Sequence, residues 1–210
     1  MAITFPLNLP TSKGIHSITL YAQSTVGVSE SPFTYKQQVY KHQGQRWEAD
    51  VRLPPMSRAD AEEWISFLLK LNGQYGTFLL GDPNGATPRG SAASTPGTPV
   101  VNGYGQTGGE LLIDGLPTSA TGYLKAGDYI QVGSGTALQL YKVLNDVDSN
   151  VSGQATLDIW PNLRNSPQGG STVIVSNAKG AFRLSSNETA FTITEFTKYG
   201  ITFGAVEVVN

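Results

Sequence analysis

Four features of the sequence combine residue types that could perform chemistry. Residues 103–108 match the letters G-x-G-x-x-G, the pattern of a loop whose backbone amides bind a phosphate. Glu62 and Glu63 are adjacent acids, and paired acids serve acid–base catalysis. Residues 146–153 carry Asp, Asp and Asn at alternate positions, as a calcium-binding loop does. The two histidines, His16 and His42, have the side chain most often used as a general base.

The surroundings of each feature favour a structural interpretation. A strand pattern, and not a helix, follows the glycine motif, so we expect a flexible loop there. The acidic pair has no neighbouring His or Lys to separate the two protonation states. The calcium-like loop has Val151 where position six requires Gly, and it lacks Glu at position twelve. Neither histidine lies in an arrangement that predicts a triad. We therefore expect no catalytic residues, no metal site and no cofactor, in a protein that is not an enzyme.

The composition excludes several further classes of protein. The 210 residues include 14 Lys and Arg against 16 Asp and Glu, and this balance argues against a basic nucleic-acid-binding face. Cysteine is absent, which excludes disulfides, thiol nucleophiles and Cys-ligated zinc. Residues 1–10 show no targeting signal, and no apolar run approaches the ~20 residues of a membrane span. The sequence thus predicts a soluble chain with no membrane partner.

The elements that would position a site are mostly strands. From Arg46 to Leu53, apolar and charged residues alternate, which is typical of a half-buried antiparallel strand. Residues 15–22 and 35–41 are further strand candidates. The stretch between them, 23–32, is rich in Ser, Gly and Val and indicates a long turn or an extended arm.

One helix is predicted from Arg58 to Leu71. Ser57 occupies the N-cap position, with Asp60 three residues later in a variant of the capping box. Gly73 follows as a natural stop. A single apolar stripe at helical spacing consists of Ala61, Trp64, Ile65, Leu68 and Leu71. We expect this stripe to cover a sheet.

The second half of the chain predicts a separate β unit. Residues 81–109 are rich in Gly, Pro, Ser and Thr and indicate a linker or long loop. Five short strands are then predicted, at 110–113, 129–132, 138–144, 154–159 and 172–175, and they suggest a small barrel of OB type. Strand candidates return at 182–184, 190–196 and 199–208.

These observations predict a mainly β fold made of two units. Three strands and a helix at the N-terminus offer too few partners to cover a sheet, so we expect the C-terminal strands to join them. Residues 1–88 and 178–210 would then form a discontinuous β-sandwich domain with one α-helix. Residues 89–177 would form an inserted OB-like barrel, with 89–109 as its linker.

Aromatic residues of the expected barrel are candidates for sugar contact. Exposed rings on such barrels stack on ligands, and Tyr123 and Trp160 could contact a glycan in this way. A place in the core is the simpler expectation for Trp160. Basic residues in this region are few, which does not favour nucleic acid.

Several segments resemble a family of bacteriophage proteins. The run from Trp47 to Met56, the helix after it and the run from Gly73 to Pro83 are similar to tail proteins of long-tailed phages. Four later segments occur in the same order as in a subgroup of distal tail proteins (siphovirus type) with an inserted OB-like domain: Lys125–Ile130, Leu140–Val143, Leu157–Pro161 and Lys179–Leu184. The resemblance covers most of the chain and is weakest at residues 1–40 and in the linker.

The resemblance implies an architectural role in the virion. Such proteins form a hexameric ring that joins the tail tube to the tail-tip, hub or baseplate proteins, and DNA passes through the lumen without specific binding. Assembly would take place in the host cytoplasm. Edge strands and an extended arm suit head-to-tail ring contacts, and Val26, Val28 and Phe33 are candidates for that interface. A carbohydrate-binding module for host adhesion is the alternative, and a tail-associated glycan hydrolase is the least favoured interpretation.

Overall fold

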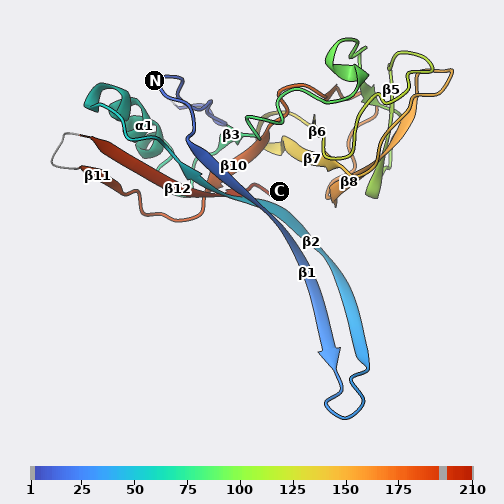
Figure 1. The fold of residues 1–210 in the computed structure, drawn as a ribbon, viewed down its shortest axis with the longest axis horizontal. Coiled ribbons are helices and arrows are strands. Elements are labelled where there is room, and N and C mark those ends of the chain that lie inside the picture. The colour runs from blue at the N-terminus through green and yellow to red at the C-terminus, as the bar shows by residue number, and fades with distance from the viewer. Residues whose placement is uncertain (1–2, 194–197, 210) are drawn as a thin grey trace.

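The computed structural model describes residues 3–193 and 198–209. Figure 1 shows two bodies side by side, with a long hairpin that leaves the molecule between them. The elements in chain order are β1 (Ser17–Glu30), β2 (Gln37–Arg52), α1 (Arg58–Lys70), β3 (Phe78–Leu80), the 3-10 turn η1 (Ser91–Ala93), β4 (Val100–Val101), β5 (Gly108–Asp114), β6 (Tyr129–Val132), η2 (Gly135–Ala137), β7 (Gln139–Val143), β8 (Ala155–Leu163), β9 (Val173–Ile174), β10 (Gly180–Leu184), β11 (Phe191–Ile193) and β12 (Tyr199–Glu207).

The first sheet joins strands from both ends of the chain. Within the described residues its order is β1-β2-β12-β10-β3, and β11 pairs with β12. Phe203 of β12 lies opposite Val51 of β2, and Phe182 of β10 lies opposite Phe78 of β3. All of these pairings are antiparallel. The expected pairing of C-terminal strands with the N-terminal sheet is therefore present.

One face of this sheet is buried as its sequence predicts. Trp47, Ala49, Val51 and Leu53 alternate with more exposed neighbours, and each is at most 6% exposed. Helix α1 covers this face, with the Trp64 ring 6.2 Å from that of Phe203. The helix begins where expected, because the Ser57 hydroxyl accepts a hydrogen bond from the Asp60 amide.

The second sheet curls into a small barrel. Its order in the described chain is β4-β5-β8-β7-β6-β9, and a bridge between Val100 and Thr172 brings the two edges together. The interior is filled by side chains that include Leu111, Tyr123 and Ile130, each without measurable exposure. The chain is thus mainly β, with a nearly closed barrel-like sheet and one α-helix in the described part, which confirms the predicted fold class.

One segment prediction is wrong in detail, and another gains more exact bounds. Residues 81–109 are not a plain linker, since η1 and β4 lie within them and Ala92 and Val101 are buried in the barrel core. The segment has few large apolar side chains, so its composition did not indicate that Ala92 and Val101 would be buried. The extended arm at 23–32, one of the two expectations for that stretch, and the strand expected at 35–41 are present as the outer parts of β1 and β2. These strands pair antiparallel from Ser17 opposite Arg52 to Glu30 opposite Gln37, with a shift in register between Ser24 and Val26.

The other expected strands are present as far as the structure describes them. Those of the barrel match β5 to β9 within a few residues. The strand expected at 190–196 is seen as β11 up to Ile193, and its residues 194–196 lie outside the described part.

The two bodies meet through a tight seam of chain and side chain. The two segments that connect the bodies touch at Gly81 and Ala178. A Cβ atom at position 81 would lie 2.3 Å from the carbonyl oxygen of Ala178, so only glycine fits there. Trp47 packs edge-on against Trp160 of the barrel, with ring centroids 4.5 Å apart. Its indole N–H also donates to the Leu140 carbonyl at 2.9 Å. The seam fixes the direction of β2 where it leaves the body.

Candidate assembly surface on the β1–β2 arm

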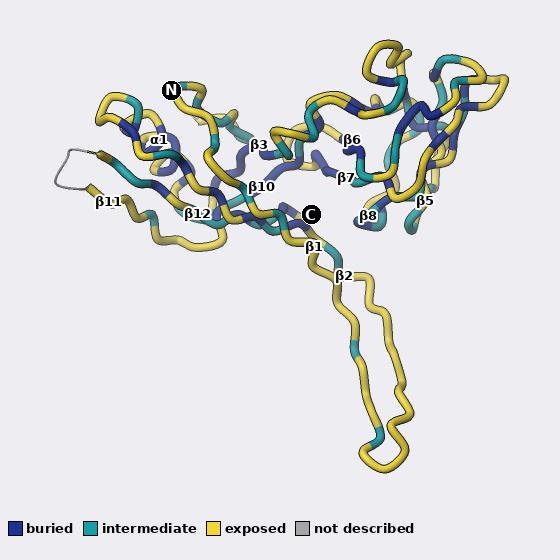
Figure 2. Tube along the Cα trace, viewed as in Figure 1, coloured by how far each residue is buried: buried dark blue, intermediate teal, exposed yellow. Residues whose placement is uncertain are grey.

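Beyond the body, β1 and β2 continue alone as a two-stranded hairpin. We call residues 24–44 the arm. Figure 1 shows it projecting away from both bodies, and Figure 2 shows it exposed over nearly its whole length. Among these residues only Gly27 and Ser31 are partly covered. A hairpin without a third strand or a packed face is marginally stable in water. Such a segment is suited to being covered by a partner.

The two faces of the arm differ in character. Residues directly opposite each other share a face, so Val28 and Val39 lie side by side, with Val26 two residues along the same face. These three valines are 48–61% exposed. Lys41 lies opposite Val26 at the end of this stripe. The other face has Tyr40 opposite Gly27, and it is otherwise polar. The arm therefore presents three valines on one face, with Lys41 at the end near the body and Glu30 opposite Gln37 at the end near the tip.

The tip of the arm is an ordered turn that displays two aromatic rings. The Ser31 amide donates to the Lys36 carbonyl at 3.0 Å, and the Tyr35 amide donates to the Ser31 carbonyl at 2.9 Å. Tyr35 adopts a left-handed backbone with φ 54°, which is uncommon for a bulky residue. Phe33 is 91% exposed and Tyr35 is 74% exposed. Two large rings held in water by a fixed turn are a strong sign of a contact surface.

A buried polar cluster anchors the base of the arm to the barrel. Arg164, just after β8, contacts the Glu207 carboxylate of β12 at 2.6 Å, and it donates to the Gln45 carbonyl at 2.7 Å. The same Glu207 oxygen accepts the Trp47 amide at 2.9 Å. The Glu207 side chain is fully buried and that of Arg164 is 12% exposed. We call these four residues the clamp, and they tie the arm, the C-terminal strand and the barrel together.

The residues proposed from sequence for a ring interface all lie on the arm. Val26 and Val28 are on its apolar face and Phe33 is at its tip. Sequence reasoning missed Val39 and Tyr35, which pairing and the turn place beside them. The signal for Val39 was the strand expected at 35–41, because an antiparallel partner of 23–32 brings its apolar residues to the same face.

Of the two candidate glycan contacts, Tyr123 is not available for stacking. Tyr123 is fully buried, and its hydroxyl donates to the Pro96 carbonyl at 2.6 Å, so neither ring face can meet a sugar. The physical reason is that Tyr123 and Leu124 pack into the core of the barrel. The same burial raises the pKa of Tyr123 to about 12. Trp160 is half-buried and its ring packs on Trp47 at the edge of the core, which is close to the core position expected as the simpler alternative.

The other sequence features have structural partners. Asp146 accepts a hydrogen bond from the Lys125 ammonium and another from the Ala126 amide, which lower the pKa of this carboxyl. Asp148 accepts the Gly122 amide at 2.6 Å. The glycine-rich stretch 103–108 leads into β5 and not into a helix. Within residues 3–193 and 198–209, no cluster of three or more His, Cys, Asp or Glu side chains is placed to hold a metal ion.

Comparisons with known proteins assign no relative. No protein-family model matches the sequence, and no curated protein matches it. No helix in the described part of the chain is long and apolar enough to cross a membrane. The arm, its tip and its clamp are therefore the features of this chain on which a functional argument can be built.

Proposed function

We propose that this chain is a structural subunit that assembles with copies of itself into a ring. The ring is the distal ring of a long-tailed bacteriophage tail, where it joins the tail tube to tail-tip or baseplate proteins. The resemblance of several segments to distal tail proteins supports the assignment of this ring to a phage tail. The exposed arm is the single observation that supports assembly, because it combines an apolar face, aromatic tip residues and unpaired strand edges.

The arm favours head-to-tail contacts. It leaves the body on one side and can reach the body of a neighbouring copy. Contacts of this heterologous kind close into rings when the rotation between neighbours permits, and six copies is the number that the family resemblance implies. The role is architectural and not enzymatic, the location is the virion tail, and DNA passes through the lumen without specific recognition.

The test compares the full chain with a variant that lacks only the arm. Ser24 lies directly opposite Gln45, so residues 25–44 can be replaced by an Asn-Gly turn that joins these two positions. The variant keeps the clamp and both bodies. We expect the full chain to form rings in negatively stained images and the shortened chain to stay monomeric with an unchanged tryptophan fluorescence spectrum, since all three tryptophans lie outside the deleted residues. A full chain that remains monomeric at high concentration would refute the proposal.

A further inference from the structure

A groove beside α1 has the shape and chemistry to receive the tip of an arm. It lies between the N-terminal segment and one face of the helix and has a volume of about 480 Å³. Leu7 and Pro10 give it apolar walls over the nearly buried Phe67, which is 5% exposed, and Glu62, Glu63 and Lys70 are its charged lining residues. Acids therefore outnumber bases along it. Glu62 is engaged by Arg58 one turn earlier at 3.3 Å, whereas Glu63 forms no ion pair within the described residues.

The arm tip has the complementary chemistry. Phe33 offers a nearly fully exposed ring for the apolar walls. Lys36 follows in the same turn, and it too has no ion-pair partner in the part of the chain that the structure describes. An exposed aromatic side chain that fills an apolar groove, with an opposite charge beside it, is the usual composition of an interface hot spot.

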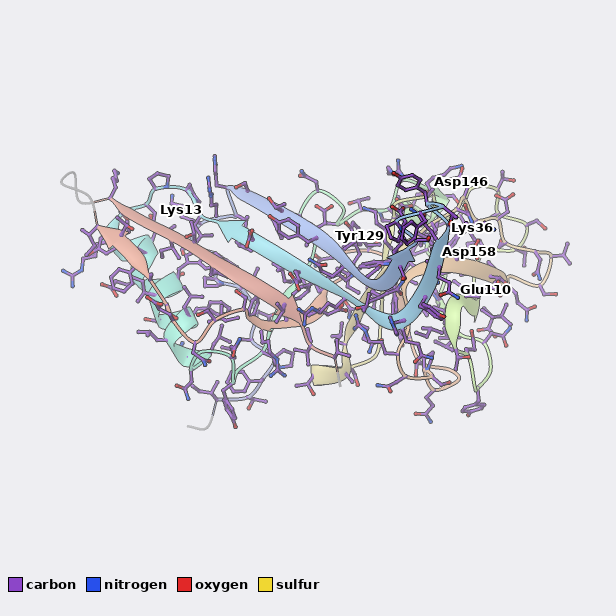
Figure 3. All side chains as sticks on the ribbon, turned by 90° about the horizontal axis from the view of Figure 1, so that it is seen from below. Lys13, Lys36, Glu110, Tyr129, Asp146 and Asp158 are labelled. Carbon is purple, nitrogen blue, oxygen red and sulfur yellow. The ribbon has the colours of Figure 1, made fainter. Side chains whose placement is uncertain are left out.

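The arm cannot reach the groove of its own chain. In Figure 1 the arm tip and α1 lie at opposite sides of the molecule. Figure 3, seen from below, places Lys36 of the tip far from Lys13, whose ammonium lies 3.7 Å from Asp60 at the start of α1. An arm that enters this groove must therefore belong to another copy, and each copy offers one tip and one groove.

We propose that the tip of each arm docks in the α1 groove of the neighbouring copy, with Phe33 against Leu7 and Pro10 and with Lys36 beside Glu63. This inference rests on the proposed ring and identifies the surfaces that build it. One tip and one groove per copy permit the heterologous contact that a closed ring requires, whereas a reciprocal exchange of arms would stop at a dimer. The tip turn, fixed by its two backbone hydrogen bonds, meets the groove without a loss of backbone freedom.

Engineered disulfides test the contact directly, because the natural chain has no cysteine. Thr34 at the tip and Ser66 on the groove face are both exposed, so Thr34→Cys/Ser66→Cys adds one thiol to each surface. We expect oxidation to give a ladder of disulfide-linked oligomers on a non-reducing gel. The matched control is Thr34→Cys/Leu112→Cys, whose second thiol lies on the outside of the barrel at a position 38% exposed. It should give no ladder.

Single substitutions distinguish the contribution of the Phe33 ring to assembly from that of the Lys36–Glu63 charge pair. Phe33→Ala should raise the concentration of half-assembly by about 30-fold or more, as loss of a hot spot does. Tyr104→Ala, which removes a ring 78% exposed in a barrel loop, should leave it unchanged. Lys36→Glu and Glu63→Lys should each weaken assembly by about two- to fivefold, and the combined variant should recover most of that loss.

The outcomes distinguish this inference from the proposed ring. Rings that form with no ladder from Thr34→Cys/Ser66→Cys, or with a ladder from the Leu112 control instead, would overturn the groove contact and leave the ring in place. A chain that forms neither rings nor disulfide-linked oligomers would refute the ring and the groove contact together.

Discussion

Removal of the arginine of the clamp should strongly destabilise the fold. In Arg164→Met the carboxylate of Glu207 stays buried but loses its cation, and the Gln45 carbonyl loses a donor. One oxygen of Glu207 already has no hydrogen-bond partner, so only the Trp47 amide on the other oxygen would remain to stabilise the charge. Breaking a buried pair in this way costs about 3–5 kcal/mol. Because 12% of the Arg164 side chain is exposed, water can reach the vacated space, and we expect a loss of about 3 kcal/mol.

The measurement is urea unfolding followed by tryptophan fluorescence, as a double-mutant cycle. Glu207→Gln and the pair Arg164→Met/Glu207→Gln complete the cycle. The uncharged amide keeps an oxygen for the Trp47 amide, so the double variant should be more stable than the two separate losses predict, by about 2 kcal/mol. Arg58→Met is the matched control, because its pair with Glu62 is exposed on both sides and should contribute at most about 0.5 kcal/mol. Losses in the cycle that add within about 0.5 kcal/mol would refute the coupling.

Three further substitutions test separate parts of the account. Ser57→Ala removes the N-cap of α1 and should lower the free energy of unfolding by about 1 kcal/mol, whereas Ser57→Asn should retain most of it. Burial raises the pKa of Tyr123 to about 12, above its unfolded value of about 10. Its contribution to stability is therefore complete below pH 10 and lost as pH rises to 12. Tyr123→Phe should make this alkaline decline shallower by up to about 1.4 kcal/mol per pH unit, and an unchanged slope would contradict the assignment. Tyr35→Asn, which suits a left-handed backbone, should leave the monomer as stable or up to about 1 kcal/mol more stable while it weakens assembly in mass photometry.

Local patterns in the sequence predicted the body of the molecule well. The alternation from Arg46 to Leu53 and the capped helix after it have strong periodic signals because each buries one face. The arm has no such signal, since neither of its faces is covered by its own chain and apolar side chains lie beside polar ones without a core to select them. Pairing of β1 with β2 is what places Val39 beside Val28, and pairing is a property of two segments together and not of either alone.

Burial was harder still to predict in segments rich in small residues. Ala92 and Val101 lie in the barrel core within a stretch that reads as a linker, because tight backbone packing there replaces large apolar side chains. The clamp was also missed. Arg164 and Glu207 are 43 residues apart, and nothing in the spacing of two charged residues indicates that they meet in the interior.

The proposed ring depends on the arm. Mass photometry and negative-stain imaging of the full chain beside the variant with residues 25–44 replaced test it most directly. The account predicts closed six-fold rings with six times the 22.4 kDa of one chain for the full protein, and single copies for the shortened one. Full-length protein that stays a single copy at every concentration, or a shortened chain that still forms rings, would contradict it.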